Sequence, residues 1–60
     1  MNAYTKVFSG HTGLDISNDI NEYIENCEYC DDSVRITAMT TIPDIYGQIV
    51  IVAFEKDEGG

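Results

Sequence analysis

The residues that could do chemistry in this chain of 60 residues are two cysteines, one histidine and a series of acids. Cys27 and Cys30 form the pair "CEYC". In a thioredoxin-type site the reactive thiolate lies at a helix N-terminus, where the helix dipole lowers its pKa. This pair instead follows a helical pattern and lies among acids, which should raise a thiol pKa. A structural zinc site needs four ligands, and only His11 could add a nitrogen. We therefore expect Cys27 in the core, Cys30 without a role, and no metal or cofactor; metal or redox use of the pair is the alternative.

His11 lies in "SGHTG", a turn bounded by glycines that leads into a helical pattern. Backbone N–H groups at such a position can bind anions, and an imidazole can act as an acid or base near neutral pH. However, no nucleophile or matched carboxylate stands at a recognisable spacing from His11, and a net charge of −8 opposes phosphate. The stretch therefore predicts a plain loop, and we expect no catalytic residue and no enzymatic activity.

Eleven acids face three cations in this sequence. The simple interpretation is a solvated surface. The sharper one is a negative surface that binds a basic protein, as in proteins that imitate the phosphate backbone of nucleic acid. We expect this surface to use four helix acids, with tyrosines as anchors, because aromatic residues are enriched among binding hot spots. The candidate residues are Asp15, Asp19, Glu22, Glu25, Tyr23, Tyr29 and Tyr46.

The same charge disfavours direct binding of nucleic acid or anionic membranes. The longest apolar run is Ile49 to Phe54, far short of a membrane span. The N-terminal "MNAYTKVFSG" lacks the basic start and apolar stretch of a secretory signal. We therefore expect a cytoplasmic protein with reduced cysteines and no membrane partner.

The elements that must position these residues follow from periodicity. Apolar residues at helical spacing form one stripe, and Thr12 with Asp15 resembles a capping box, so a helix should begin near Gly13. Strands are expected over residues 3–10, 34–41 and 47–56, with "EYCDDS" as a loop, Pro43, Asp44 and Gly47 marking a turn, and a frayed tail over 57–60. The stripe consists of Ile16, Ile20, Tyr23, Ile24 and Cys27.

This order predicts a single α+β domain over residues 1–60 with a βαββ arrangement. A right-handed crossover makes the first two strands parallel, and the last two form a hairpin. The third strand, "GQIVIVAFEK", is apolar on both faces and should lie in the centre, which gives the sheet order 1-3-2. One amphipathic helix then covers one face of the sheet.

The uncovered face predicts self-association. We expect Ile49, Ile51 and Ala53 to face the helix, unless a bulge reverses the parity of the strand. Four or five large apolar side chains on the other face are worth more than about 6 kcal/mol if buried, comparable to the stability of a small domain. A homodimer or higher homo-oligomer, packed sheet to sheet or paired edge to edge, is therefore expected. The alternatives are a different protein partner or a monomer whose loops fold over the sheet. The outward residues are expected to be Met39, Val50, Val52 and Phe54, with either Val7 or Phe8 beside them.

The segments "KVFSG", "DISNDINEYIEN", "VRITAM" and "GQIVIVAFEK", in this order, resemble the small acidic sporulation-associated proteins of spore-forming bacteria and their phage-borne relatives. The shared features are a K-V/L-F strand, a helix containing Ile20 to Ile24 and a closing pair of strands. The cysteine pair and the middle loop depart from that pattern. The resemblance implies fold and size, since the family has no assigned chemistry. In size and charge the chain is also similar to phage-encoded inhibitors of bacterial defence, and in strand order to dodecin, a flavin-storing oligomer.

These features predict a small acidic binding protein without enzymatic activity. Its expected form is a homo-oligomeric, phage-type inhibitor that binds a host protein of defence or nucleic-acid handling through a basic surface. The alternatives are a dodecin-like oligomer that binds a small ligand and a sporulation-associated structural protein. Dodecin stacks an aromatic residue on the flavin, and this chain contains no Trp.

Overall fold

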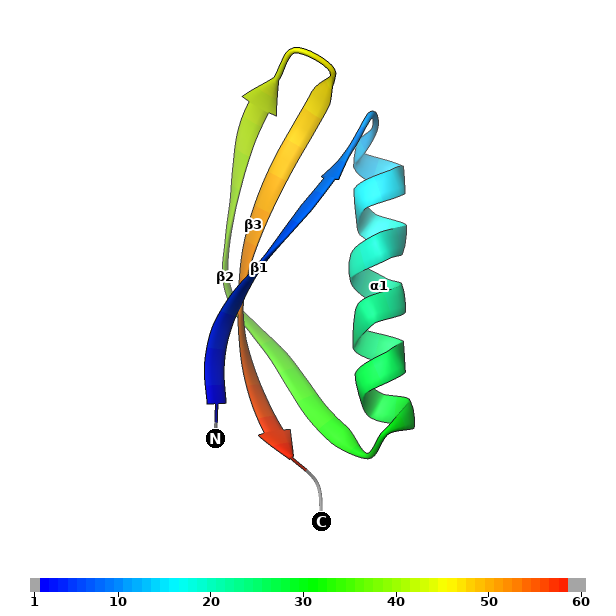
Figure 1. The fold of residues 1–60 in the computed structure, drawn as a ribbon, viewed down its shortest axis with the longest axis vertical. Coiled ribbons are helices and arrows are strands. Elements are labelled where there is room, and N and C mark those ends of the chain that lie inside the picture. The colour runs from blue at the N-terminus through cyan, green and yellow to red at the C-terminus, as the bar shows by residue number, and fades with distance from the viewer. Residues whose placement is uncertain (1, 59–60) are drawn as a thin grey trace.

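A three-stranded antiparallel sheet with one helix on one face forms the structure (Figure 1). The computed structural model describes residues 2–58. They form β1 (Asn2–Gly10), α1 (Gly13–Tyr29), β2 (Asp32–Asp44) and β3 (Gly47–Glu58). The strand order is β1-β3-β2, and both outer strands run antiparallel to β3, so β1 and β2 run parallel to each other. The predicted βαββ fold with β3 in the centre is confirmed.

Helix α1 begins at the predicted cap. The side chain of Thr12 accepts a hydrogen bond from the backbone N–H of Asp15 at 3.2 Å. The helix continues to Tyr29, so the expected loop "EYCDDS" is wrong: only Cys30 and Asp31 separate α1 from β2. Asp31 adopts the left-handed backbone conformation, with φ 64°, which turns the chain sharply from α1 into β2. Its backbone N–H donates a hydrogen bond to the carbonyl of Glu28 at 3.0 Å.

The hairpin of β2 and β3 is longer than expected. β2 runs through Pro43, which an edge strand tolerates because one side of its backbone has no partner strand. The turn between β2 and β3 therefore consists of Ile45 and Tyr46 alone. Within the predicted frayed tail 57–60, Asp57 and Glu58 belong to β3, and residues 59–60 lie outside the described part of the chain.

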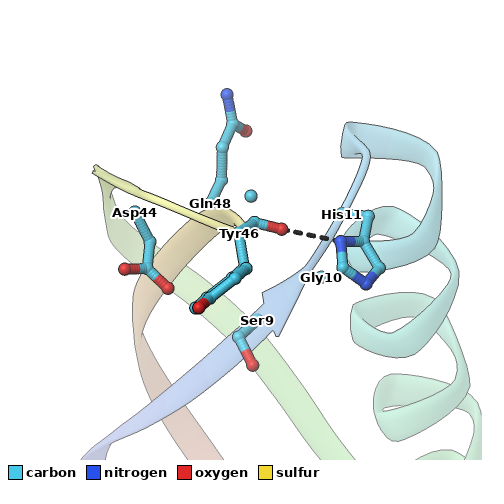
Figure 2. Close-up of a pocket in the computed structure, with 7 residues that line it drawn as sticks. Ser9, Gly10, His11, Asp44, Tyr46 and Gln48 are labelled. Atoms are coloured by element: carbon cyan, nitrogen blue, oxygen red, sulfur yellow. Dashed lines mark hydrogen bonds between the residues drawn. The ribbon is translucent and has the colours of Figure 1, made fainter.

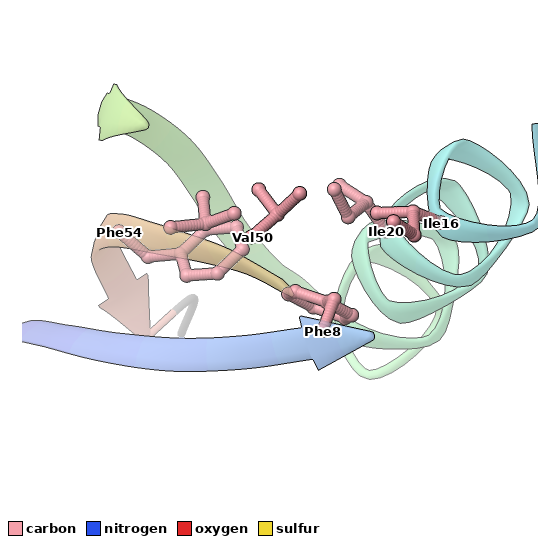
Figure 3. Packing of buried hydrophobic residues seen from close by; sticks show 6 residues of the cluster. Phe8, Ile16, Ile20, Val50 and Phe54 are labelled. Atoms are coloured by element: carbon pink, nitrogen blue, oxygen red, sulfur yellow. The ribbon is translucent and has the colours of Figure 1, made fainter. Parts of the chain in front are cut away.

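The core forms between α1 and one face of the sheet (Figure 3). The helix contributes part of the predicted stripe, and β3 contributes the row that we expected to point away from the helix. Val52 and Phe54 are almost completely buried, with 0% and 1% of their surface exposed. The expected orientation of β3 is therefore wrong. The core cluster consists of Phe8, Ile16, Ile20, Val50, Val52 and Phe54, with Tyr4, Tyr23, Ile24 and Val34 packed against it.

The reversed orientation has a cause in side-chain volume. Phe54 fills space that Ala53 could not, and the register places Tyr4 and Phe8 of β1 on the same face as Phe54 and Val50. Four aromatic rings then pack together under the helix, with Tyr23 5.2 Å and Tyr4 5.5 Å from Phe54 between ring centroids. Aromatic side chains bury more apolar area than any others. The helix α1 therefore packs against the sheet face that carries them.

A bulge in β2 also changes which side chains share a face. Ile36 pairs with Phe54, but Ala38 pairs with Ala53, so Thr37 is the extra residue in β2. The expected alternation of Val34, Ile36 and Ala38 therefore breaks at Thr37. Met39, opposite Val52, lies on the helix side of the sheet instead of the uncovered side, and 52% of its surface is exposed.

Candidate functional site: an acidic helix and an open sheet face

The exposed side of α1 is strongly negative. Between Gly13 and Tyr29 the helix carries five acids and no Lys, Arg or His. The four of them predicted to bind a partner are exposed, as predicted: Asp15, Asp19, Glu22 and Glu25. Their negative charge adds along one side of the molecule, where it would attract a basic surface.

The three cations of the chain all lie on strands, and each contacts another side chain. Arg35 pairs with Glu55 across β2 and β3. The ammonium group of Lys56 lies 3.8 Å from a carboxylate oxygen of Asp32 and 5.7 Å from the ring centre of Tyr4. Lys6 lies over the ring of Tyr23 at 4.9 Å. Within residues 2–58, neither ion pair joins a cation to an acid of α1, so these ion pairs do not neutralise the charge of the helix.

The acids near the end of α1 oppose the helix dipole. The last turn contains no basic residue, and Glu25, Glu28 and Asp31 lie at or near the negative end of the dipole. Anions there are unfavourable by a few tenths to about 1 kcal/mol each. Such a departure from local stability rules is expected at functional surfaces.

The predicted tyrosine anchors do not form one patch. Tyr23 is partly buried, and its ring packs against Phe54, so it cannot anchor a partner. Tyr29 and Tyr46 are exposed, at 90% and 74%, but Tyr29 ends α1 and Tyr46 lies in the turn between β2 and β3. These two segments are at opposite ends of the molecule (Figure 1). Tyr29 therefore adjoins the acidic side of α1 at its C-terminal end, whereas Tyr46 belongs to the hairpin tip.

The sheet face opposite the helix is apolar, and no element of residues 2–58 covers it. We call it the open face. Sequence reasoning assigned its β3 row to the core, because both rows of β3 are apolar. Val7 and Ile42 are 63% and 45% exposed, and the β3 members are only partly buried, although no helix covers them. The open face consists of Val7, Ala38, Ile42, Ile49, Ile51 and Ala53.

The two phenol groups of Tyr4 and Tyr23 contact each other through a hydrogen bond beneath α1. Burial raises the pKa of Tyr23 well above its ordinary value, and the hydrogen bond between Tyr23 and Tyr4 adds to this shift. The neutral phenol is therefore the stable form in the folded protein. A tyrosine held in this way stabilises the core and is a poor nucleophile or proton donor at neutral pH.

His11 ties the loop before α1 to the hairpin tip (Figure 2). Its Nδ1 lies 2.6 Å from the carbonyl oxygen of Tyr46, so Nδ1 carries the proton and donates it. The two segments are close elsewhere too, since a Cβ on Gly47 would lie 2.1 Å from the carbonyl oxygen of Gly10. A shallow pocket of about 170 Å³ lies between them. It is smaller than typical ligand pockets of about 300–1,000 Å³, so this end of the molecule has the features of a structural clasp.

The cysteines have the environments expected from the sequence. Cys27 is buried and Cys30 is exposed, and both are free thiols. Within residues 2–58, no three His, Cys, Asp or Glu side chains converge to hold a metal ion. The helix of the described chain is also too short and too polar to cross a membrane.

A second shallow groove runs between α1 and β2, on the side of the sheet that the helix covers incompletely. Its volume is about 220 Å³, and Met39 and Thr41 line it opposite Ile16 and Ile20. Like the pocket at the hairpin tip, it is smaller than most small-molecule sites. The acidic side of α1 and the open face therefore remain the candidate binding surfaces.

Comparison with protein-family models, curated proteins and solved structures found no match for this chain. The resemblance to small acidic sporulation-associated proteins therefore stays a prediction.

Proposed function

We propose that this chain is a binding protein without catalytic activity, whose acidic helix side docks on a basic surface of a protein partner. The observation that carries the proposal is the charge of α1, which has five acids and no cation, while the ion pairs of residues 2–58 involve none of these acids. A basic groove that normally holds nucleic acid is the kind of surface that would attract such a helix. Inhibition of a host protein that handles nucleic acid is the specific form of this proposal.

The placement of the acids supports binding over simple solvation. Solvation alone would be served by acids anywhere on the surface, including the positive end of the helix dipole. Here acids continue to Glu28 and Asp31 at the negative end, at a cost in stability. Exposed Tyr29 lies beside them and offers an aromatic anchor.

The test compares two variants of equal net charge. Glu22→Gln with Glu25→Gln removes two negative charges from the helix side, and Asp44→Asn with Asp57→Asn removes two from the sheet. The immobilised wild type is first exposed to lysate of the native host, and the basic protein that it captures is identified. The affinity of this captured protein is then measured for the wild type, the helix variant and the sheet variant. We expect about a tenfold loss for the helix variant, since two exposed ion pairs are worth up to about 1 kcal/mol each. The sheet variant should bind like the wild type.

Two results would contradict the proposal. Equal losses in the two variants would mean that net charge alone attracts the protein. Capture of no basic protein by the wild type would leave the acids as a solvated surface. If a basic protein is captured, competition by duplex DNA tests whether it handles nucleic acid. Only a partner that binds the acidic protein through its nucleic-acid groove should release it when DNA is added.

A further inference from the structure

We infer that a second copy of this chain covers the open face, so that two sheets pack face to face in a two-fold dimer. The inference concerns a different surface from the proposed function and does not depend on it. The open face is an apolar surface that no element of residues 2–58 covers: its members come from all three strands and lie side by side in the registers of β3 with β1 and β2. Packing of two such faces is the ordinary way in which sheets form a sandwich.

The centre of this sheet side contains no charge. Apart from the open-face residues, the register places three small polar side chains there: Thr5, Ser9 and Thr40. The charged residues lie toward the ends, with Asp44 beside the hairpin turn, and Asp57 and the Arg35–Glu55 pair toward the other end. A neutral apolar centre with charges at its rim has the composition of a protein–protein interface.

The distribution of charge favours packing of two copies through this face over packing through their helices. Each chain carries a charge of −8, so two copies repel each other. In a sheet-to-sheet dimer the two helices lie on the outside, and their acidic sides are roughly 30 Å apart, given about 10 Å between sheets and about 10 Å for each helix. The Debye length is about 8 Å at physiological salt, so this repulsion is screened. Packing through α1 would instead bring the acids of the two copies together.

The size of the face sets the expected affinity. β3 contains 12 residues and the sheet three strands, so one face measures about 40 by 14 Å. Two copies would bury about 1,100 Å² in total, close to the lower end of the range for specific interfaces. We therefore expect a dimer that dissociates in the micromolar range.

The experiment is sedimentation velocity of the full chain from 1 to 500 µM, with circular dichroism as the check of folding. The disrupting variants are Ile51→Glu, in the centre of the open face, and Val7→Glu, whose position is 63% exposed in one copy and so tolerates the change without unfolding. The matched control is Leu14→Glu, which places the same charge at an apolar position of α1 that is 71% exposed.

The expected result is a monomer–dimer equilibrium for the wild type and for Leu14→Glu. Val7→Glu and Ile51→Glu should both weaken it at least tenfold, because each places two carboxylates in one apolar interface. A wild type that stays monomeric at 500 µM would overturn the inference, since another partner would then cover the face. A dimer that Val7→Glu leaves unchanged, or that Leu14→Glu disrupts, would also overturn it, because the contact would then lie at a strand edge or on the helix.

Discussion

The two rows of side chains on β3 are nearly alike in chemistry and differ in what lies against them. Val50, Val52 and Phe54 are buried against α1. Ile49, Ile51 and Ala53 lie on the other side of the sheet, where no helix of residues 2–58 packs over them, and are partly exposed. Both rows belong to one strand and alternate along it, so the difference is not one of position in the chain. It arises because one helix can cover only one face of the sheet.

This difference separates two uses of apolar side chains. The inner row, with the aromatic residues of β1 and α1, accounts for the folding of a single copy. The outer row adds little to that core, yet it is as apolar as the inner row. Exposed apolar surface of this extent usually marks an interaction site in a native protein. The helix shows the same contrast, with an apolar stripe against the sheet and unneutralised acids on its exposed side.

The largest effect is expected from truncation of the inner row. Phe54→Ala should lower the free energy of unfolding by about 3–5 kcal/mol, because a large ring is removed from a buried site and leaves a cavity. Ile51→Ala, the matched change in the outer row, should cost less than half as much when the protein is dilute. Urea denaturation at 1 µM measures both. Equal losses at that concentration would mean that the outer row belongs to the core of a single copy.

A second effect concerns the end where β1, α1 and the hairpin meet. Gly47→Ala should lower the free energy of unfolding by more than about 2 kcal/mol, since the new methyl group would collide with the carbonyl of Gly10 and φ there is 152°. Thermal unfolding with Gly13→Ala as the control checks this, because a Cβ at Gly13 meets open space. If both variants were equally stable, the hairpin tip would not be fixed against the loop before α1.

A third effect is a loss of stability at high pH that originates on the inner face. Burial raises the pKa of Tyr23 above its ordinary value near 10. The folded protein therefore keeps this phenol neutral after the unfolded chain has ionised it. The resulting stability is complete below pH 10 and is lost as the pH rises from 10 toward the folded pKa.

Tyr23→Phe should therefore flatten the fall in the free energy of unfolding above pH 10. Tyr46→Phe should leave it unchanged, since Tyr46 is exposed. Denaturant titrations between pH 8 and pH 11 provide the measurement. Parallel curves for the wild type and Tyr23→Phe would show that this tyrosine does not link folding to pH.

The smallest effect tests the acids of the helix. Glu28→Lys should raise the free energy of unfolding by about 0.3–1 kcal/mol, because a cation suits the negative end of the helix dipole. The same variant should bind a basic partner more weakly. Unfolding by urea gives the first quantity, with Asn26→Lys, one turn short of the end, as the comparison. A loss of stability would contradict the view that Glu28 is placed for binding at the expense of the helix.

The order of elements could be predicted because the sequence changes from period two to helical period and back, and Thr12 marks the start of α1. The orientation of β3 could not be predicted from alternation, since both of its rows are apolar. Side-chain size is the signal that indicates the buried row. The row with Phe54 is larger than the row with Ala53, and it pairs with Tyr4 and Phe8 of β1. The open face was therefore expected for the right reason but assigned to the wrong residues.

Two further errors have local causes. The bulge at Thr37 has no glycine or proline to mark it, so regular alternation through "VRITAMTT" was the natural expectation. The extent of β2 was underestimated because Pro43 usually ends a strand, whereas at a sheet edge it does not interrupt pairing. The acidic surface, in contrast, was predictable, because its residues fall outside the apolar stripe of the helix.

The most direct test of the account is a search for contacts between copies across the open face. In a sample that mixes isotope-labelled and unlabelled chains at about 500 µM, filtered NOE spectra report only methyl groups close to the other copy. We predict intermolecular NOEs that join the methyl groups of Val7, Ile49 and Ile51 to the open face of the partner. NOEs from Leu14 or Ile45 instead, or none at all at this concentration, would contradict the claim that a second copy covers this face.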